Sequence, residues 1–406
     1  MVYDETGRDA PAEPSSGVPA AVLEHVFDDP VDGEPGRDRI AVHVVWEFLL
    51  VAGLAGLTYL LWHRNAGALR GDGLKSLLVD VVALGLLALA AGLSLRAAAV
   101  NLAVGPVAVA AALHFAEQGD QGLREALLPA VAVAALGGAV LALAVVVLHV
   151  PGWAASLAGA AGVIVYIERR TGPIVVQGTY DPRGTAVNLF AGFAAVAVLG
   201  GLFGAVKAIR RLVGRFRPVG DPARRRGTVA ALITALALVG STVLAMLAGV
   251  LIAANGTGPV APTSGLDWSI LAVGTAMLAG TSAYGRRGGI LGTLFAVSLV
   301  VVFLAWAQAR GWTVSRWAVG GVTLAGGLLV TRLVEALGRP RSVTGQAFEQ
   351  VPAGDGTIST GWALSRPGPV DTWPSVLPVQ AAETTVDPWE APRWESGPQR
   401  WDADDR

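Results

Sequence analysis

The chain has 406 residues, of which 53% are hydrophobic and 15% charged, and its mean hydropathy is +0.55. This composition is too apolar for an ordinary soluble domain, and the net charge of −1 conceals acidic and basic residues that are sorted into separate segments. The absence of cysteine excludes a disulfide framework, a thiolate metal site and a cysteine nucleophile.

The first 39 residues carry ten acidic residues against three arginines, with few apolar runs. Such a segment cannot bury enough apolar surface to fold alone, so we predict that residues 1–39 form a disordered acidic tail. The tail also lacks the positive start and short apolar core of a secretory signal.

Residues 40–338 contain a succession of apolar stretches, which predict an all-α, polytopic membrane bundle with some broken helices. A bilayer core of about 30 Å needs about 20 apolar helical residues, and Pro151–Ile167 is at the short limit, where a tilted or re-entrant helix is an alternative. About ten transmembrane segments are expected: Ile40–Trp62, Leu74–Leu95, Ala97–Phe115, Ala126–His149, Pro151–Ile167, Thr185–Val206, Gly227–Ala254, Trp268–Tyr284, Gly288–Ala307 and Val314–Leu337.

A basic loop sets the expected orientation. Eight Lys and Arg residues lie between Lys207 and Arg226, and such loops stay in the cytoplasm because Lys and Arg resist translocation. With six predicted spans before the loop and four after it, both termini are expected in the cytoplasm of a multi-pass plasma-membrane protein. The segment His63–Lys75 departs from this rule, since it would lie outside despite its three basic residues. A miscounted helix near residue 151 is the alternative.

Residues 339–406 carry nine prolines and five tryptophans and show no helical or strand periodicity. We predict a disordered cytoplasmic extension. The alternative is a tryptophan-bearing peptide that docks on a partner or on the membrane interface, where tryptophan is favoured.

Motifs for enzymatic chemistry are missing. The two lysines, Lys75 and Lys207, do not complete a phosphate-binding glycine loop, because the near-miss GALRGDGLKS (67–76) spaces its last glycine wrongly. ATP hydrolysis by that route is excluded, and the five histidines lack zinc-site spacing. We therefore expect no enzyme, no bound metal or cofactor, and no nucleic-acid partner.

Three ionisable residues interrupt the apolar stretches: His43, Glu47 and Asp80. Their burial costs several kcal/mol unless they are paired, so each is a candidate for a substrate or proton path. His43 and Glu47 lie four residues apart on one helix face and could pair, and Asp80 is close enough to its helix end to reach interfacial water. A structural or interfacial role is the alternative for all three.

Two glycine-containing clusters predict broken helices. In the first, Gly105 and Pro106 interrupt residues 97–115, and Asn101 is placed to cap the half-helix that follows. In the second, small residues surround two arginines in residues 277–296. A packing kink and a tight cytoplasmic turn are the respective alternatives to a cavity lined by broken helices.

At these clusters the chain resembles the integral-membrane permease subunits of bacterial ABC importers of the ribose/monosaccharide and branched-chain amino acid type. The early family motif, an acidic or amide residue followed by L-S-V-G and a small residue, is similar to Asn101-Leu102-Ala103-Val104-Gly105-Pro106. The late glycine motif is similar to residues 279–293, and the family's cytoplasmic loop is faintly similar to residues 219–227. Asn101 stands where sugar permeases often have Asp, and Leu271 where an acidic residue is usual.

The resemblance implies a transport subunit for a small polar solute such as a sugar or an amino acid. Two permease copies, or this chain and a sister chain, would form the pore in the lipid bilayer. Separate ABC ATPase subunits would bind the ATP, and an extracytoplasmic solute-binding protein would deliver the solute. It implies a substrate path at Asn101, Gly105, Pro106, Gly280, Thr281 and Ser282, and an ATPase-coupling element at Gly220, Asp221, Pro222, Arg224 and Arg225.

Two other classes of function remain open on the sequence. A degenerate, non-transporting relative would be a membrane scaffold that recruits cytoplasmic partners through its two tails. A membrane-embedded glycosyl or acyl transferase is disfavoured, because no Asp, Glu and His residues cluster at one membrane face.

Overall fold

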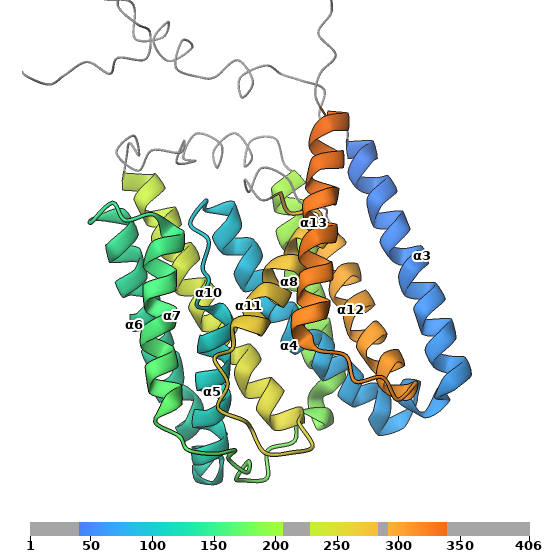
Figure 1. The fold of residues 1–406 in the computed structure, drawn as a ribbon, viewed down its shortest axis with the longest axis horizontal. Coiled ribbons are helices and arrows are strands. Elements are labelled where there is room, and N and C mark those ends of the chain that lie inside the picture. The colour runs from blue at the N-terminus through green and yellow to red at the C-terminus, as the bar shows by residue number, and fades with distance from the viewer. Residues whose placement is uncertain (1–39, 206–227, 283–290, 339–406) are drawn as a thin grey trace, which may run out of the picture. The chain divides into compact units, whose positions relative to one another are not determined.

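The computed structural model describes residues 40–205, 228–282 and 291–338, which form ten α-helices packed side by side (Figure 1). No strand occurs within these ranges, where one isolated antiparallel bridge joins Ile174 to Val260. The helices are α3 (Ile40–Arg64), α4 (Gly71–Arg96), α5 (Val104–Gln118), α6 (Leu123–Val146), α7 (Gly152–Glu168), α8 (Ala186–Ala205), α10 (Thr228–Asn255), α11 (Leu266–Leu278), α12 (Gly292–Ala309) and α13 (Arg316–Gly338), with three short 3-10 helices, η1 (Ala66–Leu69), η2 (Gly119–Gln121) and η3 (Pro182–Thr185).

The all-helical class is confirmed for the described residues, and each predicted stretch overlaps one helix. Six helices, α3, α4, α6, α8, α10 and α12, are long and apolar enough to cross a membrane. The expected count of about ten spans is not confirmed, because α7 and α11 are shorter apolar helices of 17 and 13 residues. The coarser conclusion stands: the chain has the helices of a multi-pass membrane protein.

Helices α4 and α10 form the centre of the helical domain and pack against each other. Their buried faces combine Leu and Val with small residues, and the small residues allow backbones to approach closely. A Cβ atom on Gly249 of α10 would lie 2.0 Å from the carbonyl oxygen of Ala108 in α5, so only glycine fits there. Close backbone approach of this kind is typical of helices that pack without a hydrophobic driving force between them.

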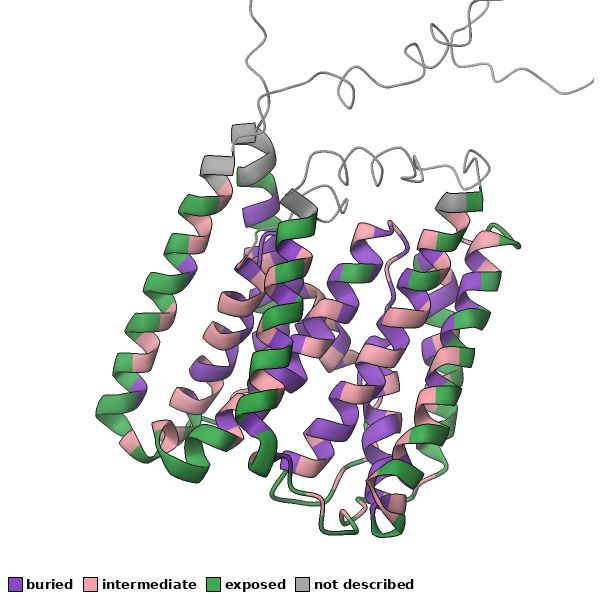
Figure 2. Ribbon diagram, turned by 180° about the vertical axis from the view of Figure 1, so that it is seen from behind, coloured by how far each residue is buried: buried purple, intermediate pink, exposed green. Residues whose placement is uncertain are grey.

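The peripheral helices carry many exposed residues (Figure 2), and large apolar residues are among them. Phe48 of α3 is 75% exposed, Val133 of α6 is 69% exposed and Val322 of α13 is 73% exposed. An aqueous surface does not tolerate continuous apolar exposure of this extent, whereas lipid does. The exposure pattern therefore agrees with the hydropathy of the sequence.

The helix ends divide between two ends of the helical domain. The beginnings of α3 and α10 and the last turns of α8 and α13 lie at one end, which we call the basic-loop end because residues 206–227 connect α8 to α10 (Figure 1). The opposite end carries residues 65–70, 119–122, 169–185, 256–265 and 310–315. This arrangement agrees with the even number of predicted spans on each side of the basic loop.

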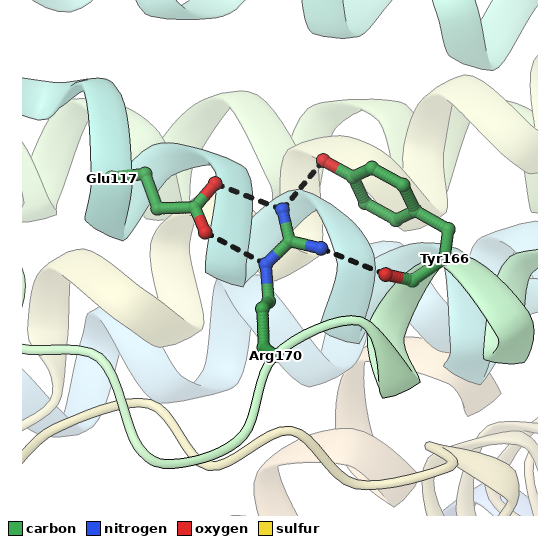
Figure 3. A network of polar contacts seen from close by, with 3 residues as sticks. All are labelled: Glu117, Tyr166 and Arg170. Atoms are coloured by element: carbon green, nitrogen blue, oxygen red, sulfur yellow. Dashed lines mark hydrogen bonds and ion pairs between the residues drawn. The ribbon is translucent and has the colours of Figure 1, made fainter.

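At the opposite end, Arg170, which follows α7, forms an ion pair with Glu117 of α5 (Figure 3). The guanidinium of Arg170 donates to both carboxylate oxygens of Glu117, at 2.7 and 2.8 Å, and to the carbonyl and hydroxyl oxygens of Tyr166, at 2.8 and 2.7 Å. The hydrogen bonds to Glu117 raise the pKa of Arg170 above its ordinary value. Bidentate geometry makes this a stronger link than a single ion pair.

Candidate functional site

The segment between α4 and α5 is a non-helical stretch inside the helical domain. Helix α4 ends at Arg96 and α5 begins at Val104, and Ala98 between them has a positive φ of 51°. The sequence predicted a helix across residues 97–115 with a break at Gly105 and Pro106, but the break lies earlier. Pro106 instead lies in the first turn of α5, where a missing N–H leaves no intrahelical hydrogen bond unmade.

Four buried serines from four helices satisfy the polar groups of this segment. They are Ser94 of α4, Ser156 of α7, Ser241 of α10 and Ser269 of α11, and we call them, with Val100–Gly105, the serine junction. Irregular backbone at membrane depth is tolerated only where it is buried in protein or lines a watery cavity. The hydroxyls therefore make the interruption of the helix possible.

Asn101 lies at the centre of the serine junction and is fully buried, with 0% exposure. Its backbone N–H donates to the Ser94 hydroxyl at 3.1 Å, and its side-chain amide donates to the Ser241 hydroxyl at 3.0 Å. Its amide oxygen accepts from the N–H of Ala103 at 3.0 Å. The side chain thus stabilises the turn just before α5, but the N-cap residue of that helix is Ala103, so the predicted capping role of Asn101 is wrong.

Ser156 and Ser269 bind the backbone on either side of Asn101. The N–H of Leu102 donates to the Ser156 hydroxyl at 3.1 Å, and that hydroxyl donates to the carbonyl of Val100 at 2.9 Å. The Ser269 hydroxyl donates to the carbonyl of Leu102 at 2.7 Å and accepts from the N–H of Gly105 at 2.9 Å. Each hydroxyl therefore satisfies one donor and one acceptor.

The N-terminal ends of α5 and α11 meet at the serine junction. A Cβ atom on Gly105 would lie 2.0 Å from the carbonyl oxygen of Gly265, the N-cap residue of α11, whose φ is 72°. Glycine is required at the first position by the close approach and favoured at the second by the left-handed backbone. The two short helices therefore begin next to each other, with their positive dipole ends close together.

The second glycine cluster lies at the other end of α11. Gly280, which has a φ of 94°, and Thr281 and Ser282 are buried. The N–H of Thr281 donates to the carbonyl of Ala276 at 3.1 Å, which closes the end of α11. Residues 283–290 of this predicted motif lie outside the described residues.

The two predicted parts of the substrate path approach the same stretch of α4 but do not touch each other directly. Gly92 of α4 faces the second part, since a Cβ atom on it would lie 4.0 Å from the Thr281 hydroxyl. Ser94, two residues further along α4, accepts a hydrogen bond from the backbone N–H of Asn101 in the first part. Gly105, by contrast, contacts the beginning of α11, about 20 Å from its end by helix geometry.

Helix α3 holds the end of α11 and the beginning of α12, a contact that sequence reasoning missed. The indole N–H of Trp46 donates to the carbonyl of Leu278 at 2.7 Å. The carboxylate of Glu47 accepts from the N–H groups of Leu291 and Gly292, at 2.9 and 3.1 Å. Glu47 is thus a helix cap supplied by another helix, where a negative charge is favoured by the helix dipole.

Asp80 joins a polar network near the opposite end. Its carboxylate accepts from the Asn255 amide at 2.7 Å, and the amide oxygen of Asn255 accepts from Ser76 at 3.1 Å and from Arg183 at 3.2 Å. Asp80 is exposed, although the residues next to it in α4 are buried. This network supports the interfacial interpretation of Asp80, since its partners belong to the ends of α10 and η3.

The ATPase-coupling element, residues 220–225, lies outside the described residues. Within the described ranges, no group of three or more His, Cys, Asp and Glu residues could hold a metal ion. A scan against protein-family models, a search of curated proteins and a search of solved structures each found no match to this chain.

Proposed function

We propose that the chain is the transmembrane permease subunit of an ABC importer for a small polar solute, sugar-like or amino-acid-like, in a bacterial plasma membrane. One observation carries the proposal: α5 and α11 both begin inside the helical domain, and their N-terminal ends meet at Gly105 and Gly265. Discontinuous helices of this kind present hydrogen-bonding groups near the membrane midplane in many transporters. The resemblance of the two glycine motifs gives the proposal its family.

In this proposal the serine junction is the closed gate of the solute path. Only the Ser269 hydroxyl, among the junction serines, joins α5 to α11, through its bonds to Leu102 and Gly105. Separation of the two helices would release these groups and uncover Asn101 for the solute. Gly280, Thr281 and Ser282 would form the path further along α11.

The driving force would come from partner subunits. Separate ATPase subunits would dock on the cytoplasmic basic loop through Gly220, Asp221, Pro222, Arg224 and Arg225, where arginines can bind carboxylates in a bidentate manner. A second permease copy or a sister permease would complete the pore. A solute-binding protein would deliver the solute at the opposite end, and both termini would be cytoplasmic.

A co-purification experiment tests the partner assignment. The full chain, tagged and extracted from its native membranes, should bring down an ABC ATPase. D221A/R224A should reduce the amount of that ATPase at least about tenfold without lowering the amount of chain in the membrane, because bidentate contacts are lost. R169A, at the opposite end, is the control and should change nothing. Equal recovery from D221A/R224A would reject the coupling element.

Reconstitution of that complex tests the path. N101L should abolish ATPase stimulation by the loaded binding protein, while N101D, which keeps a hydrogen-bonding side chain, should retain measurable stimulation. Both variants need the same thermal stability for a valid comparison. If N101L stimulates normally, Asn101 does not belong to the solute path.

A membrane scaffold is the second candidate, and the full burial of Asn101 favours it. Both ends of the Asn101 amide are already bonded to Ser241 and Ala103 inside the protein, as expected of a purely structural residue. A scaffold would recruit cytoplasmic proteins through residues 1–39 and 339–406. Its signature would be co-purified proteins that are lost on deletion of either tail, with no ATPase among them.

A further inference from the structure

The ends of α3 and α12 lie side by side at the opposite end of the helical domain (Figure 1). Leu61 of α3, Leu69 of η1, Trp306 of α12 and Val314 of the loop after α12 belong to one apolar cluster. Residues 62–70 include the end of α3 and residues 310–317 follow the end of α12, so the packing of these helices brings the two segments to the same place.

Aromatic side chains are exposed around this cluster. Trp62 is 44% exposed, Trp312 is 50% exposed and Trp317 is 52% exposed, and Tyr59 is 65% exposed one turn inside α3. Tryptophan and tyrosine concentrate where a membrane meets water, because their rings are apolar and their N–H or O–H groups are polar. These residues mark the level of the lipid headgroups on this side.

Three exposed arginines lie among these aromatic residues without an acidic partner. Nearby, Lys75 and Arg316 are paired with Asp72 and Asp267, at 3.0 and 2.7 Å. The three arginines are Arg64, Arg70 and Arg310, and we call them the arginine corner. No described acidic residue forms an ion pair with any of them within 4.0 Å.

Two members of the arginine corner are held over exposed indole rings. The guanidinium carbon of Arg70 lies 4.4 Å from the ring centre of Trp62, and that of Arg310 lies 5.9 Å from the ring centre of Trp312. Contact with a ring fixes the plane of the guanidinium and leaves its N–H donors free to bind an anion. The corner is therefore partly preorganised for an oxygen-rich anionic group.

The rest of the same end has the opposite character. Near the ends of α5, α6 and α7, acidic residues outnumber basic ones, and Arg170 is fully engaged by Glu117 and Tyr166. The acidic residues there are Glu117, Asp120, Glu125, Glu168 and Asp181, and the basic ones are Arg124, Arg169, Arg170 and Arg183. The α3–α12 side has Arg64, Arg70, Lys75, Arg310 and Arg316 against Asp72 and Asp267, so it attracts an anion more strongly.

We propose that the arginine corner binds the phosphate headgroup of an anionic phospholipid. The arginines supply the charge and the bidentate donors for the phosphate. The exposed side chains of Tyr59 and Leu60 lie on α3 toward the membrane interior and would contact the acyl chains. An anionic head joined to an apolar chain matches both features, whereas a soluble anion matches only the first. The proposal depends neither on a transport function nor on the orientation of the chain in the membrane.

Native mass spectrometry of the purified full chain tests the proposal. The protein is partly delipidated in detergent and then exchanged with equimolar phosphatidylglycerol and phosphatidylcholine. We expect preferential retention of phosphatidylglycerol, and R64Q/R70Q/R310Q should lower that preference at least about tenfold, because each arginine near a lipid surface contributes about fivefold. R64K/R70K/R310K should retain most of the preference because the charge is kept.

The matched control is R124Q/R169Q, which removes two exposed arginines from the other side of the same end. This variant should keep the full preference. The single variants R64Q, R70Q and R310Q, each expected to lower the preference by about fivefold, decide the matter if the triple variant does not fold. Unchanged preference in all the corner variants would overturn the proposal, and so would an equal loss in the control. Displacement of the lipid by millimolar inorganic phosphate would show a general anion site and would also overturn it.

Discussion

Removal of the Ser269 hydroxyl is the sharpest test of how the interrupted helix is stabilised. S269A deletes a group that accepts a hydrogen bond from the N–H of Gly105 and donates one to the carbonyl of Leu102. Ser269 is 3% exposed, so water has little access to either backbone group. The substitution leaves one donor and one acceptor without a partner and adds no new atoms.

The expected cost follows from those two groups. An unsatisfied buried donor or acceptor costs about 1–3 kcal/mol, whereas a single hydrogen bond measured within a membrane protein averages about 0.6 kcal/mol. Two groups lost together should lower the free energy of unfolding by about 2–6 kcal/mol, with a lower bound near 1 kcal/mol if each bond has only the membrane-protein average. The same helix offers the reverse case in Thr275, which is fully buried and whose hydroxyl has no partner. T275V should be neutral or stabilising by up to about 1 kcal/mol, because the hydroxyl is desolvated without compensation.

Unfolding by SDS, followed by tryptophan fluorescence and far-UV circular dichroism, gives both free energies under one condition. The pair controls for the loss of a hydroxyl from α11, since both changes replace a small polar side chain by an apolar one. If S269A and T275V shift the unfolding midpoint by the same amount and in the same direction, the hydroxyl of Ser269 does not hold α5 to α11.

Three further predictions follow from individual contacts. G105A should prevent stable folding, because its Cβ atom would lie 2.0 Å from the carbonyl oxygen of Gly265. G137A, whose Cβ atom would have no neighbour within 4 Å, should leave the thermal midpoint unchanged. Similar yields of the two folded variants would contradict the close approach. E47A should destabilise the chain by about 1 kcal/mol and speed hydrogen exchange at the beginning of α12. E47Q should lose less stability, because its amide oxygen still accepts hydrogen bonds. Unchanged exchange in E47A would reject the cap. Burial raises the pKa of Tyr180, so the unfolded chain releases the phenolic proton first and stability should fall as the pH rises above about 10. Y180F should remove that fall, and identical dependence of stability on pH in the two proteins would reject the prediction.

The helices could be predicted because apolar length is a local property of the sequence. Each stretch of Leu, Val and Ala predicted a helix, and the described structure has a helix at each of those places. The interruption between α4 and α5 was harder to place, because Gly105 and Pro106 are the strongest local breakers in that stretch. Tertiary hydrogen bonds from Ser94, Ser156 and Ser269 instead stabilise an earlier break, and no local pattern encodes them.

The polar partners of the candidate site could be predicted only in part. Asn101 attracts attention because an amide in an apolar stretch needs partners, and the structure supplies them from Ser94 and Ser241. The signal that could have found those serines is the same one, since each is a hydroxyl in a span of Leu, Val and Ala, alone at Ser94 and beside Thr242 at Ser241. The role of Glu47 was out of reach, because the N–H groups that it caps are 244 and 245 residues away in the sequence.

The orientation of the chain can be settled by cysteine labelling, because the native sequence has no cysteine. The positive-inside rule places Arg215 in the cytoplasm, and the only strong objection was the basic segment after α3. Within that segment Lys75 is paired with Asp72, whereas Arg64 and Arg70 have no acidic partner among the described residues, so the orientation needs a direct test. In intact cells an impermeant maleimide should label T313C, which lies exposed at the opposite end, and should label R215C only after permeabilisation. Labelling of R215C but not T313C in intact cells would reverse the topology and move the proposed ATPase contact to the wrong side of the membrane.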